Sequence, residues 1–346
     1  MKFSRLQQVL IALFLTSALG FFTWFNVSKQ RVLVLQSYDT GYSWTRDIDS
    51  AIRHVLSTNQ HIAVRWHHMD TKRHPWPRFK ENAGILARNT IDNWKPDLII
   101  AGDDDAQEYA ATYYADDPKV RIVFLGINGQ IEPYGYDKLR HKVTGILERK
   151  QFNGVRQLLL DYARLKGITT PLRIVHIGDN SPSVKKDDEF VRAFAWAPVA
   201  LVDTRLVSTF AEWQQAVEEA QRSADFILTT NYRNLSVSAD DQALVAPAKV
   251  VGWSEGHSAI PLIGTNGFFV EDGGMIAIAT SPYEQGEVAA RMALDILAKR
   301  KTPDQIPIES TRQFTVSMRG ERIKARSFFL PDVYESFARS TDNYFP

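Results

Sequence analysis

The chain has 346 residues but no cysteine, and its formal net charge at pH 7 is only +1. Without cysteine, no disulfide can hold the fold and no lipid can be attached through an N-terminal Cys. Because there is no charge excess and no stripe of Lys and Arg interleaved with aromatic residues, nucleic acid is not expected as a partner. The hydrophobic share of 44% and the charged share of 23% are typical of globular proteins. These values leave a small molecule as the expected partner.

The sequence also lacks the common catalytic motifs. It contains no Gly-x-Ser-x-Gly elbow, no glycine-rich phosphate loop ending in Lys-Ser/Thr, and no dinucleotide fingerprint after the first strand. His61, His67, His68 and His74 lie close together in sequence, but neighbouring side chains on a strand alternate faces, so His67 and His68 cannot easily share a metal ion. We therefore predict a protein that binds without catalysis and has no metal or cofactor; a periplasmic α/β hydrolase or transferase is the alternative.

Residues 1–30 differ from the rest of the chain. Lys2 and Arg5 precede an uncharged run over 9–25, which is longer than a signal-peptide core and shorter than the about 20 residues of a membrane span. Residues 18–20 offer small side chains for cleavage, yet aromatic residues continue the run beyond them. We predict a signal peptide or signal anchor, with the continuation favouring an anchor. The body of the protein is then periplasmic or extracytoplasmic.

Six short apolar runs of strand type each end at small, hydrogen-bonding or acidic residues, and a helical pattern follows. In an open α/β sheet the ligand crevice lies outside the carboxyl ends of the parallel strands, so these polar residues predict a small-molecule site. Repeated alternation of strand and helix predicts doubly wound parallel sheets in an α/β fold. The six runs cover residues 32–35, 98–101, 122–125, 172–177, 226–228 and 250–252.

Two such series follow one another along the chain, one beginning at residue 31 and the second after residue 147. We expect a helix over 240–245 in the second series, and a strand over 273–279, a helix over 284–299 and a strand over 313–318 after it. These last elements would cross back between the two halves. Three crossovers would form a hinge.

Several short segments carry a resemblance to a known family, and together they span nearly all of residues 31–318. The segments are 36–45, 69–73, 101–106, 123–128, 143–145 and 281–286. Each motif is weak alone, but their shared order is fairly specific. They resemble a type 1 periplasmic binding protein, of the branch of ABC-transporter substrate-binding proteins whose relatives also serve as extracytoplasmic sensor regions of histidine kinases and diguanylate cyclases.

The resemblance implies two Rossmann-like lobes that close by hinge motion around a ligand held between them. It places 31–146 plus 282–311 in the N-terminal lobe and 147–281 plus 312–330 in the C-terminal lobe. Residues 331–346 would be a C-terminal tail. The possible anchor departs from a free transport receptor, which is normally released from its signal peptide, and so favours a sensory role.

The loop after the first strand offers the strongest candidate contacts. Ser37, Tyr38, Tyr42 and Trp44 combine hydroxyl groups with aromatic faces that can stack on a ring or a sugar. The structural alternative is that Trp44 packs under the following helix.

Acidic residues follow the third strand. We expect Asp103 or Asp104 to face the cleft, where a carboxylate accepts hydrogen bonds from hydroxyl or amine groups, and Asp105 to cap the next helix. No further ligand cluster supports a metal site beside them. Asn128 follows the fourth strand and is the next candidate contact.

The second half supplies Asn180, Ser181, Asn231, Trp253 and Glu255 at the corresponding strand ends. Asn180 and Ser181 fit helix capping as well as ligand binding. Trp253 is the preferred contact, because a large aromatic side chain directly after a core strand has little structural reason to be there.

We predict from these observations an exported, monomeric solute-binding protein that serves as the substrate-binding component of an ABC transporter and contacts a membrane permease. The alternative is a ligand-sensing partner of a membrane histidine kinase or diguanylate cyclase. Aromatic side chains together with carboxylates suit a sugar, a nucleoside or an amine equally well.

Overall fold

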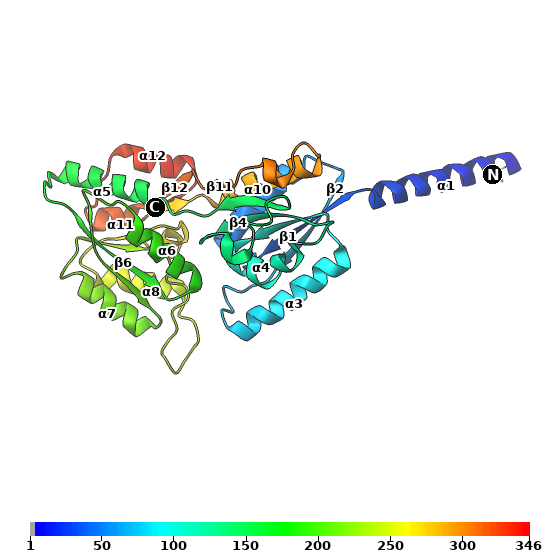
Figure 1. Ribbon diagram of the computed structural model, residues 1–346. Coiled ribbons are helices and arrows are strands. Elements are labelled where there is room, and N and C mark those ends of the chain that lie inside the picture. Colours follow the sequence, from blue (N-terminus) through cyan, green and yellow to red (C-terminus); the bar gives the residue numbers. More distant parts are fainter. Residues whose placement is uncertain (1–3) are drawn as a thin grey trace.

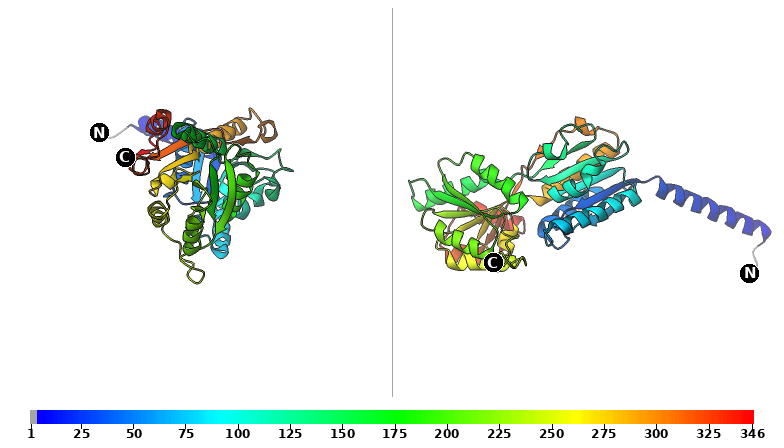
Figure 2. Two further views of the ribbon diagram at one scale, coloured as in Figure 1. Left: turned by 90° about the vertical axis from the view of Figure 1, so that its left-hand side faces the viewer. Right: turned by 60° about the horizontal axis from the view of Figure 1, so that its bottom comes forward.

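The computed structural model describes residues 4–346, with residues 25–27 described by their backbone alone. Lys2, which belongs to the predicted N-terminal segment, lies outside the described residues. Two α/β lobes lie side by side, and the helix α1 (Arg5–Val27) extends from the first lobe away from the second (Figures 1 and 2). The chain therefore has two sheets and a separate N-terminal helix.

The first sheet has six strands in the order β11-β5-β4-β3-β1-β2, and all its pairs are parallel. Its central strands read as continuous apolar runs because helices cover both faces, as is usual for parallel sheets. The strands are β1 (Gln30–Gln36), β2 (Ile62–His68), β3 (Leu98–Gly102), β4 (Arg121–Ile127), β5 (Val143–Leu147) and β11 (Glu309–Ser310).

The helices of this lobe include one that comes from far along the chain. Helix α10 packs against α2, and Gly286 permits the close approach because a Cβ there would lie 2.4 Å from the carbonyl oxygen of Ile48. The helices are α2 (Ser43–Leu56), α3 (Pro77–Trp94), α4 (Asp103–Tyr109) and α10 (Pro282–Leu297), with short 3-10 turns at Ala111–Tyr114, Glu132–Tyr134 and Pro303–Gln305.

The second sheet has seven strands in the order β13-β12-β10-β9-β8-β6-β7, and only the β10–β12 pair is antiparallel. The prediction of doubly wound sheets is confirmed, with this one antiparallel pair added. The strands are β6 (Arg173–Asp179), β7 (Ala200–Val207), β8 (Phe226–Thr229), β9 (Leu262–Gly264), β10 (Ile276–Thr280), β12 (Phe314–Arg319) and β13 (Tyr344–Phe345).

Helices cover both faces of this sheet as well (Figure 1). Thr209 and Glu212 form a capping box at the start of α7, which fixes where that helix begins. The helices are α5 (Phe152–Lys166), α6 (Pro182–Ala193), α7 (Phe210–Ala220), α8 (Pro247–His257), α9 (Phe268–Glu271), α11 (Gly320–Ala325) and α12 (Asp332–Ser340).

Some predicted elements were wrong. The run 250–252 is not a strand but the middle of α8, which begins with Pro247 in its first turn and buries Val250 and Val251. The expected helix over 240–245 is an irregular loop. The strand β9 was missed, and residues 331–346 form α12 and β13, which extend the second sheet. The lobe boundaries given above stay a prediction.

The chain passes between the two sheets three times: after β5, after β10, and between β11 and β12. A buried amide ties these passages together, because Gln285 at the start of α10 donates to the carbonyl oxygen of Leu147 and to Thr311 Oγ1, and accepts from the backbone N–H of Gly126. Glu284 beside it accepts from the backbone N–H groups of Arg312 and Gln313.

Helix α1 is long and apolar enough to cross a membrane, with a mean hydropathy of 1.7 over Arg5–Trp24. Its described side chains have almost no contact with either lobe. A signal sequence near an N-terminus has the same length and composition, so this helix fits both the predicted signal peptide and the predicted anchor.

Candidate functional site

A cavity lies between the two lobes, at the carboxyl ends of the parallel strands. Its volume is about 20 Å³, which is room for about one water molecule and far below the several hundred cubic ångström of a typical ligand pocket. A ligand of ordinary size therefore enters only when the lobes separate. The lining residues are Tyr38, Tyr42, Trp44, Lys72, Asp103, Asn128, Glu148, Lys150, Ser183, Asp187, Asn231, Asn266 and Phe268.

Asp103 is the most unusual acidic group in this cavity. It follows β3 with a backbone φ of 65°, in the left-handed region that few non-glycine residues adopt. Its Oδ1 accepts from Trp44 Nε1 at 3.2 Å, whereas its buried Oδ2 has no partner among the described residues. Burial, with Glu148 and Asp104 nearby, holds the pKa of this carboxyl well above its usual range. Strain and an unpaired buried oxygen are typical of functional sites.

The backbone around Asp103 is built to allow this conformation. Gly126 at the bulge in β4 has a φ of 71°, and a Cβ there would lie 2.7 Å from Asp103 Oδ1. Glycine is therefore required for two reasons, the positive φ and the close approach of the carboxylate.

Lys72 follows β2 and supplies a cation to the same cavity. Its Nζ lies 5.2 Å from the ring centre of Tyr38 and has no carboxylate within ion-pair distance among residues 4–346. Burial lowers the pKa of this ammonium, although Asp179 and Asp103 oppose that effect. The cavity thus has an ammonium and a carboxylate oxygen that no protein group satisfies.

The other charged groups in the cavity satisfy one another. Lys150 donates to Glu148 and, at 2.9 Å, to Asn266 Oδ1, and its Nζ lies 3.9 Å from Asp187 Oδ2. Burial acts to lower the pKa of Lys150, but Glu148 and Asp187 outweigh it and the pKa is raised. Burial raises the pKa of Asp187 to about 7, with Lys150 opposing and Glu148 adding to the shift.

Aromatic rings from both lobes form a wall of the cavity. The ring centres of Tyr42, from the loop before α2, and Phe268, from α9, are 5.7 Å apart, and Tyr38 meets Tyr42 edge to face at 5.5 Å. Arg233 lies over both Phe268 and Tyr42, at 4.5 and 5.4 Å from the ring centres, and its guanidinium pairs with Asp272 at 2.7 Å. Burial raises the pKa of both tyrosines well above the ordinary value, so they are neutral donors.

One ion pair joins the lobes beside this cavity. Lys186 on α6 donates to Asp104 Oδ1 at 2.7 Å, and Tyr134 donates to the same oxygen. Lys186 packs over Gly129, where a Cβ would lie 2.9 Å from its Cδ. The described conformation therefore has its lobes in direct contact.

Six of the twelve residues proposed from the sequence line the cavity: Tyr38, Tyr42, Trp44, Asp103, Asn128 and Asn231. Four others have a different place. Ser37 is fully buried and bridges the carbonyl oxygen of Gly102 and the N–H of Ala106, while Asp104 belongs to the interlobe ion pair. Asn180 and Ser181 lie on a separate groove, and Ser181 is the N-cap residue of α6.

Trp253 and Glu255 do not line the cavity. Because α8 replaces the predicted strand, Trp253 lies on a helix, where it stacks on His257 at 4.5 Å and meets Phe210 at 6.1 Å between ring centres. Glu255 accepts from Arg326 and from the N–H of Met275, and its side chain is fully buried. Asp105 is not the helix cap either: α4 already begins at Asp103, and Asp105 pairs with Lys80 at 2.9 Å.

Sequence reasoning missed seven of the cavity residues. Lys72 lay inside a segment that carried the family resemblance, so its motif was visible, but a charged residue in a loop has no pattern that marks it as buried. Asn266 and Phe268 follow β9, the missed strand, and would have been found with it. The seven are Lys72, Glu148, Lys150, Ser183, Asp187, Asn266 and Phe268.

A second buried network has the residue types of a catalytic triad. His176 on β6 contacts Asp188 at 2.9 Å through Nδ1 and Thr230 Oγ1 at 3.0 Å through Nε2. Burial acts to raise the pKa of Asp188, but the hydrogen bonds from His176 and Arg192 to its carboxylate outweigh burial. The pKa of Asp188 therefore falls to about 2. His176 and Thr230 are buried and neither lines the interlobe cavity, so this chain of hydrogen bonds joins β6, α6 and β8 within the second lobe.

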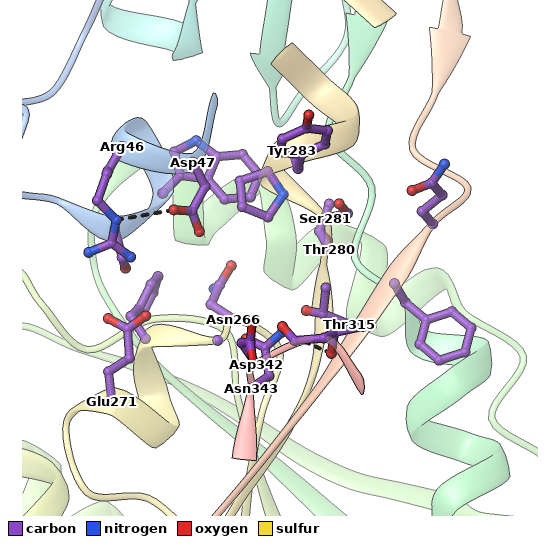
Figure 3. A pocket seen from close by; sticks show the side chains of 18 of the residues that line it. Arg46, Asp47, Asn266, Glu271, Thr280, Ser281, Tyr283, Thr315, Asp342 and Asn343 are labelled. Atoms are coloured by element: carbon purple, nitrogen blue, oxygen red, sulfur yellow. Dashed lines mark hydrogen bonds and ion pairs between the residues drawn. The ribbon is translucent and has the colours of Figure 1, made fainter. Parts of the chain in front are cut away.

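A larger groove, of about 740 Å³, lies beside the crossings and not at the strand ends (Figure 3). Asp47 and Tyr283 of the first lobe face Asn266, Glu271 and Asp342 of the second across it (Figure 3). Trp44, Asn266 and Phe268 separate this groove from the smaller interlobe cavity. We take the smaller cavity as the candidate site, because Asp103, whose buried Oδ2 has no partner, lines it, whereas Glu271 and Asp342 are exposed to solvent.

Comparison with known proteins gives one family. Residues 181–329 match the model of the family described as ABC transporter substrate binding protein. No curated protein sequence matches the chain.

Solved structures share the fold over most of the chain. A Streptococcus pneumonia ABC domain in complex with L-Trp is 15% identical, with a TM-score of 0.64 over 88% of this chain and 98% of that one. A ligand-free, open substrate binding protein with adhesive properties from Clostridium difficile is 14% identical, with a TM-score of 0.63 over 91% and 98%. A periplasmic ribose ABC transporter protein from Conexibacter woesei is 14% identical, with a TM-score of 0.54 over 86% and 95%.

Proposed function

We propose that this chain, which has the type 1 periplasmic binding protein fold and matches the ABC transporter substrate binding protein family over residues 181–329, captures a small zwitterion between its lobes. The observation that carries the proposal is a pair of ionisable side chains, Asp103 and Lys72, that line one cavity, with Asp103 Oδ2 buried and unpaired and Lys72 in no ion pair among residues 4–346. An ammonium group of the ligand would satisfy Asp103, and a ligand carboxylate would satisfy Lys72. Both ends of the ligand are then recognised by charge-assisted hydrogen bonds.

The aromatic wall narrows the ligand class further. Tyr38, Tyr42 and Phe268 offer ring faces for an apolar or aromatic body, which suits an α-amino acid with a large side chain better than a sugar. The sequence left a sugar, a nucleoside or an amine open, and the aromatic wall together with the two ionisable groups favours the amine. The pneumococcal protein of the same fold is described in complex with L-Trp, which is compatible with this class.

The ligand also explains the raised pKa of Asp103. Without a partner, burial favours the protonated carboxyl; an ammonium within hydrogen-bond distance would lower the pKa and stabilise the carboxylate. Ligand binding would therefore release a proton from the protein at pH values below the unliganded pKa.

The test is a thermal-unfolding screen of the full chain against matched probes. L-tryptophan carries both charges, tryptamine lacks the carboxylate, indole-3-propionate lacks the ammonium, and D-ribose lacks both. Because a ligand that binds only the folded state raises the melting temperature, L-tryptophan should give the largest shift. A larger shift with D-ribose would contradict the zwitterion, and conversion of any probe to a product would contradict a pure binding function.

For the biological role we propose delivery to a membrane permease as the substrate-binding component of an ABC transporter. A second candidate, a ligand-sensing subunit beside a membrane kinase or cyclase, is favoured by α1, because its apolar run continues beyond the small residues 18–20. The mass of the N-terminal peptide of the protein purified from cells distinguishes a cleaved receptor from a tethered one.

A further inference from the structure

We propose that the outer end of the first lobe rests on an anionic lipid surface, so that the protein stands upright on the membrane that holds its N-terminal helix. This inference rests on the tethered form of the proposed function. It concerns the basal edge, which we define as the end of the first sheet where β1, β3, β4 and β5 begin and where α2, α3 and α10 end. The partner is the headgroup layer of a bilayer that contains acidic phospholipids.

Contacts within the lobe bring these chain ends together. Gln30, the first residue of β1, donates from its side chain to the carbonyl oxygen of Leu297 at the end of α10, at 2.9 Å. Arg31 donates to the carbonyl oxygen of Trp94 at the end of α3, also at 2.9 Å. The N–H of Ile122 near the start of β4 donates to the carbonyl oxygen of Lys142, just before β5.

Helix α1 leaves the lobe from the same edge. It ends at Val27 and β1 begins at Gln30, so Ser28 and Lys29 alone connect them. The helix points away from the second lobe (Figures 1 and 2). If α1 spans a bilayer, a link of this length holds the basal edge within about 10 Å of the membrane surface, since each residue spans at most about 3.6 Å.

The basal edge carries a local excess of positive charge. Its segments contain twelve Lys and Arg against seven Asp and Glu, an excess of five, whereas the whole chain has +1, so the remainder has −4. Arg53, Lys95, Lys119 and Lys138 are exposed and have no carboxylate partner among residues 4–346, while Asp295 pairs with Arg300 at 2.7 Å. The segments are 29–31, 53–60, 92–97, 116–121, 137–142 and 295–304.

The basic excess of the basal edge fits an anionic bilayer. Acidic lipids attract Lys and Arg only within about a Debye length, roughly 8 Å at physiological ionic strength, and the short link keeps the basal edge in that range. The second lobe lies beyond this range, on the far side of the first lobe from α1 (Figures 1 and 2). The interlobe cavity then lies between the membrane-proximal and the distal lobe.

The chain allows a clean measurement because it has no cysteine. Thr58→Cys in the exposed turn after α2 would report on the basal edge, and Ala239→Cys on an exposed loop of the second lobe is its matched control. The full chain with each substitution is reconstituted in vesicles of phosphatidylcholine with or without phosphatidylglycerol, and the rate of labelling by a membrane-impermeant maleimide is measured.

Phosphatidylglycerol should slow the labelling of Thr58→Cys by about fivefold and leave Ala239→Cys unchanged, and high salt should restore the rate by screening. Substituting Glu for Lys299, Arg300 and Lys301 should abolish the slowing, whereas Glu at the second-lobe residues Lys185, Arg222 and Lys249 should not. If the first triple variant unfolds, Lys299→Gln with Lys301→Gln should still halve the effect.

A labelling rate at Thr58→Cys that is independent of phosphatidylglycerol would overturn the proposal, as would equal slowing at Ala239→Cys. Slowing in cells but not in vesicles would also overturn it, because the edge would then contact a protein. If cells cleave α1 from the protein, the upright arrangement would also be overturned, because no tether would then hold the basal edge at the membrane. None of these results affects the thermal shift by L-tryptophan, so failure here is distinguishable from failure of the binding function.

Discussion

Lys186 and Asp104 form an ion pair between the lobes, with Lys186 Nζ 2.7 Å from Asp104 Oδ1. The lysine side chain is 29% exposed and the aspartate 11%, so the pair is partly shielded from water. Each partner lies at the start of a helix that follows a parallel strand, α6 after β6 and α4 after β3. The contact can exist only when the lobes are together, and it therefore stabilises the closed form relative to the open form.

Lys186→Ala should shift the lobe equilibrium toward the open form. Because ligand affinity falls with the population of the binding-competent state, the dissociation constant for the amino acid with the largest thermal shift should rise by about threefold to tenfold. Isothermal titration calorimetry measures the constant, and small-angle scattering should show a larger radius of gyration.

Lys185→Ala is the matched control, because Lys185 is its exposed neighbour. The interpretation fails if Lys185→Ala and Lys186→Ala weaken binding equally, or if neither variant changes the scattering.

Asp103→Asn should stabilise the protein and weaken ligand binding. At pH 8 the buried carboxyl costs free energy whether it stays ionised without a partner or takes up a proton on folding, and Asn tolerates the left-handed backbone well. The free energy of unfolding at pH 8 should therefore rise by about 1–3 kcal/mol. Loss of the carboxylate should raise the dissociation constant at least about tenfold.

Chemical denaturation and calorimetry test the two effects separately. In acid, where the wild-type carboxyl is protonated, the stability difference should shrink. A destabilised Asp103→Asn variant with unchanged affinity would show that this carboxylate serves the fold and not the ligand.

Asp187 should make stability depend on pH. Its pKa is raised to about 7 in the fold against 3.8 for the free side chain, so the folded state binds one more proton than the unfolded chain between these values. The contribution of Asp187 to the free energy of unfolding is therefore complete below about pH 4 and is lost as the pH rises through about 7. Asp187→Asn should flatten this part of the profile.

Melting temperatures of wild type and Asp187→Asn from pH 4 to pH 8 check the prediction. As the pH rises, the melting temperature of Asp187→Asn should increase relative to that of the wild type. Parallel profiles would mean that Asp187 stays ionised throughout, paired with Lys150.

Trp253→Ala should leave ligand affinity within about twofold of the wild type, because Trp253 packs on Phe210 and His257 outside the cavity. Loss of partly buried aromatic surface should lower stability by about 1–3 kcal/mol. Tyr42→Ala is the comparison inside the cavity and should weaken binding. If Trp253→Ala binds the ligand weakly but is as stable as the wild type, Trp253 would be a ligand contact after all.

The strands that position Tyr38 and Asp103 could be read from the sequence because both end in polar residues after continuous apolar runs. In a parallel sheet such ends meet at one edge, so their convergence follows from topology alone. Trp253 could not be placed in this way. A short apolar run such as 250–252 is compatible with a strand or with one buried face of a helix, and the signal that favours the helix is Pro247 in the first turn of α8.

The charged residues of the cavity were hidden for a different reason. Lys72 and Lys150 lie in loops, and neither periodicity nor propensity indicates which loop lysine will be buried between two lobes. Their role depends on contacts between segments far apart in the chain, as in the case of Lys150 and Asn266. Single-sequence patterns describe local structure and give no information on such pairs.

The amide of Gln285 links three segments on the first-lobe side of the crossings, and Glu284 holds the backbone of Arg312 and Gln313. The crossings are also bonded to one another, from Thr280 Oγ1 to the carbonyl oxygen of Arg149 and from Gln151 to the carbonyl oxygen of Thr311. Because all three are joined in this way, we expect them to twist together, so that the lobes open by one concerted rotation.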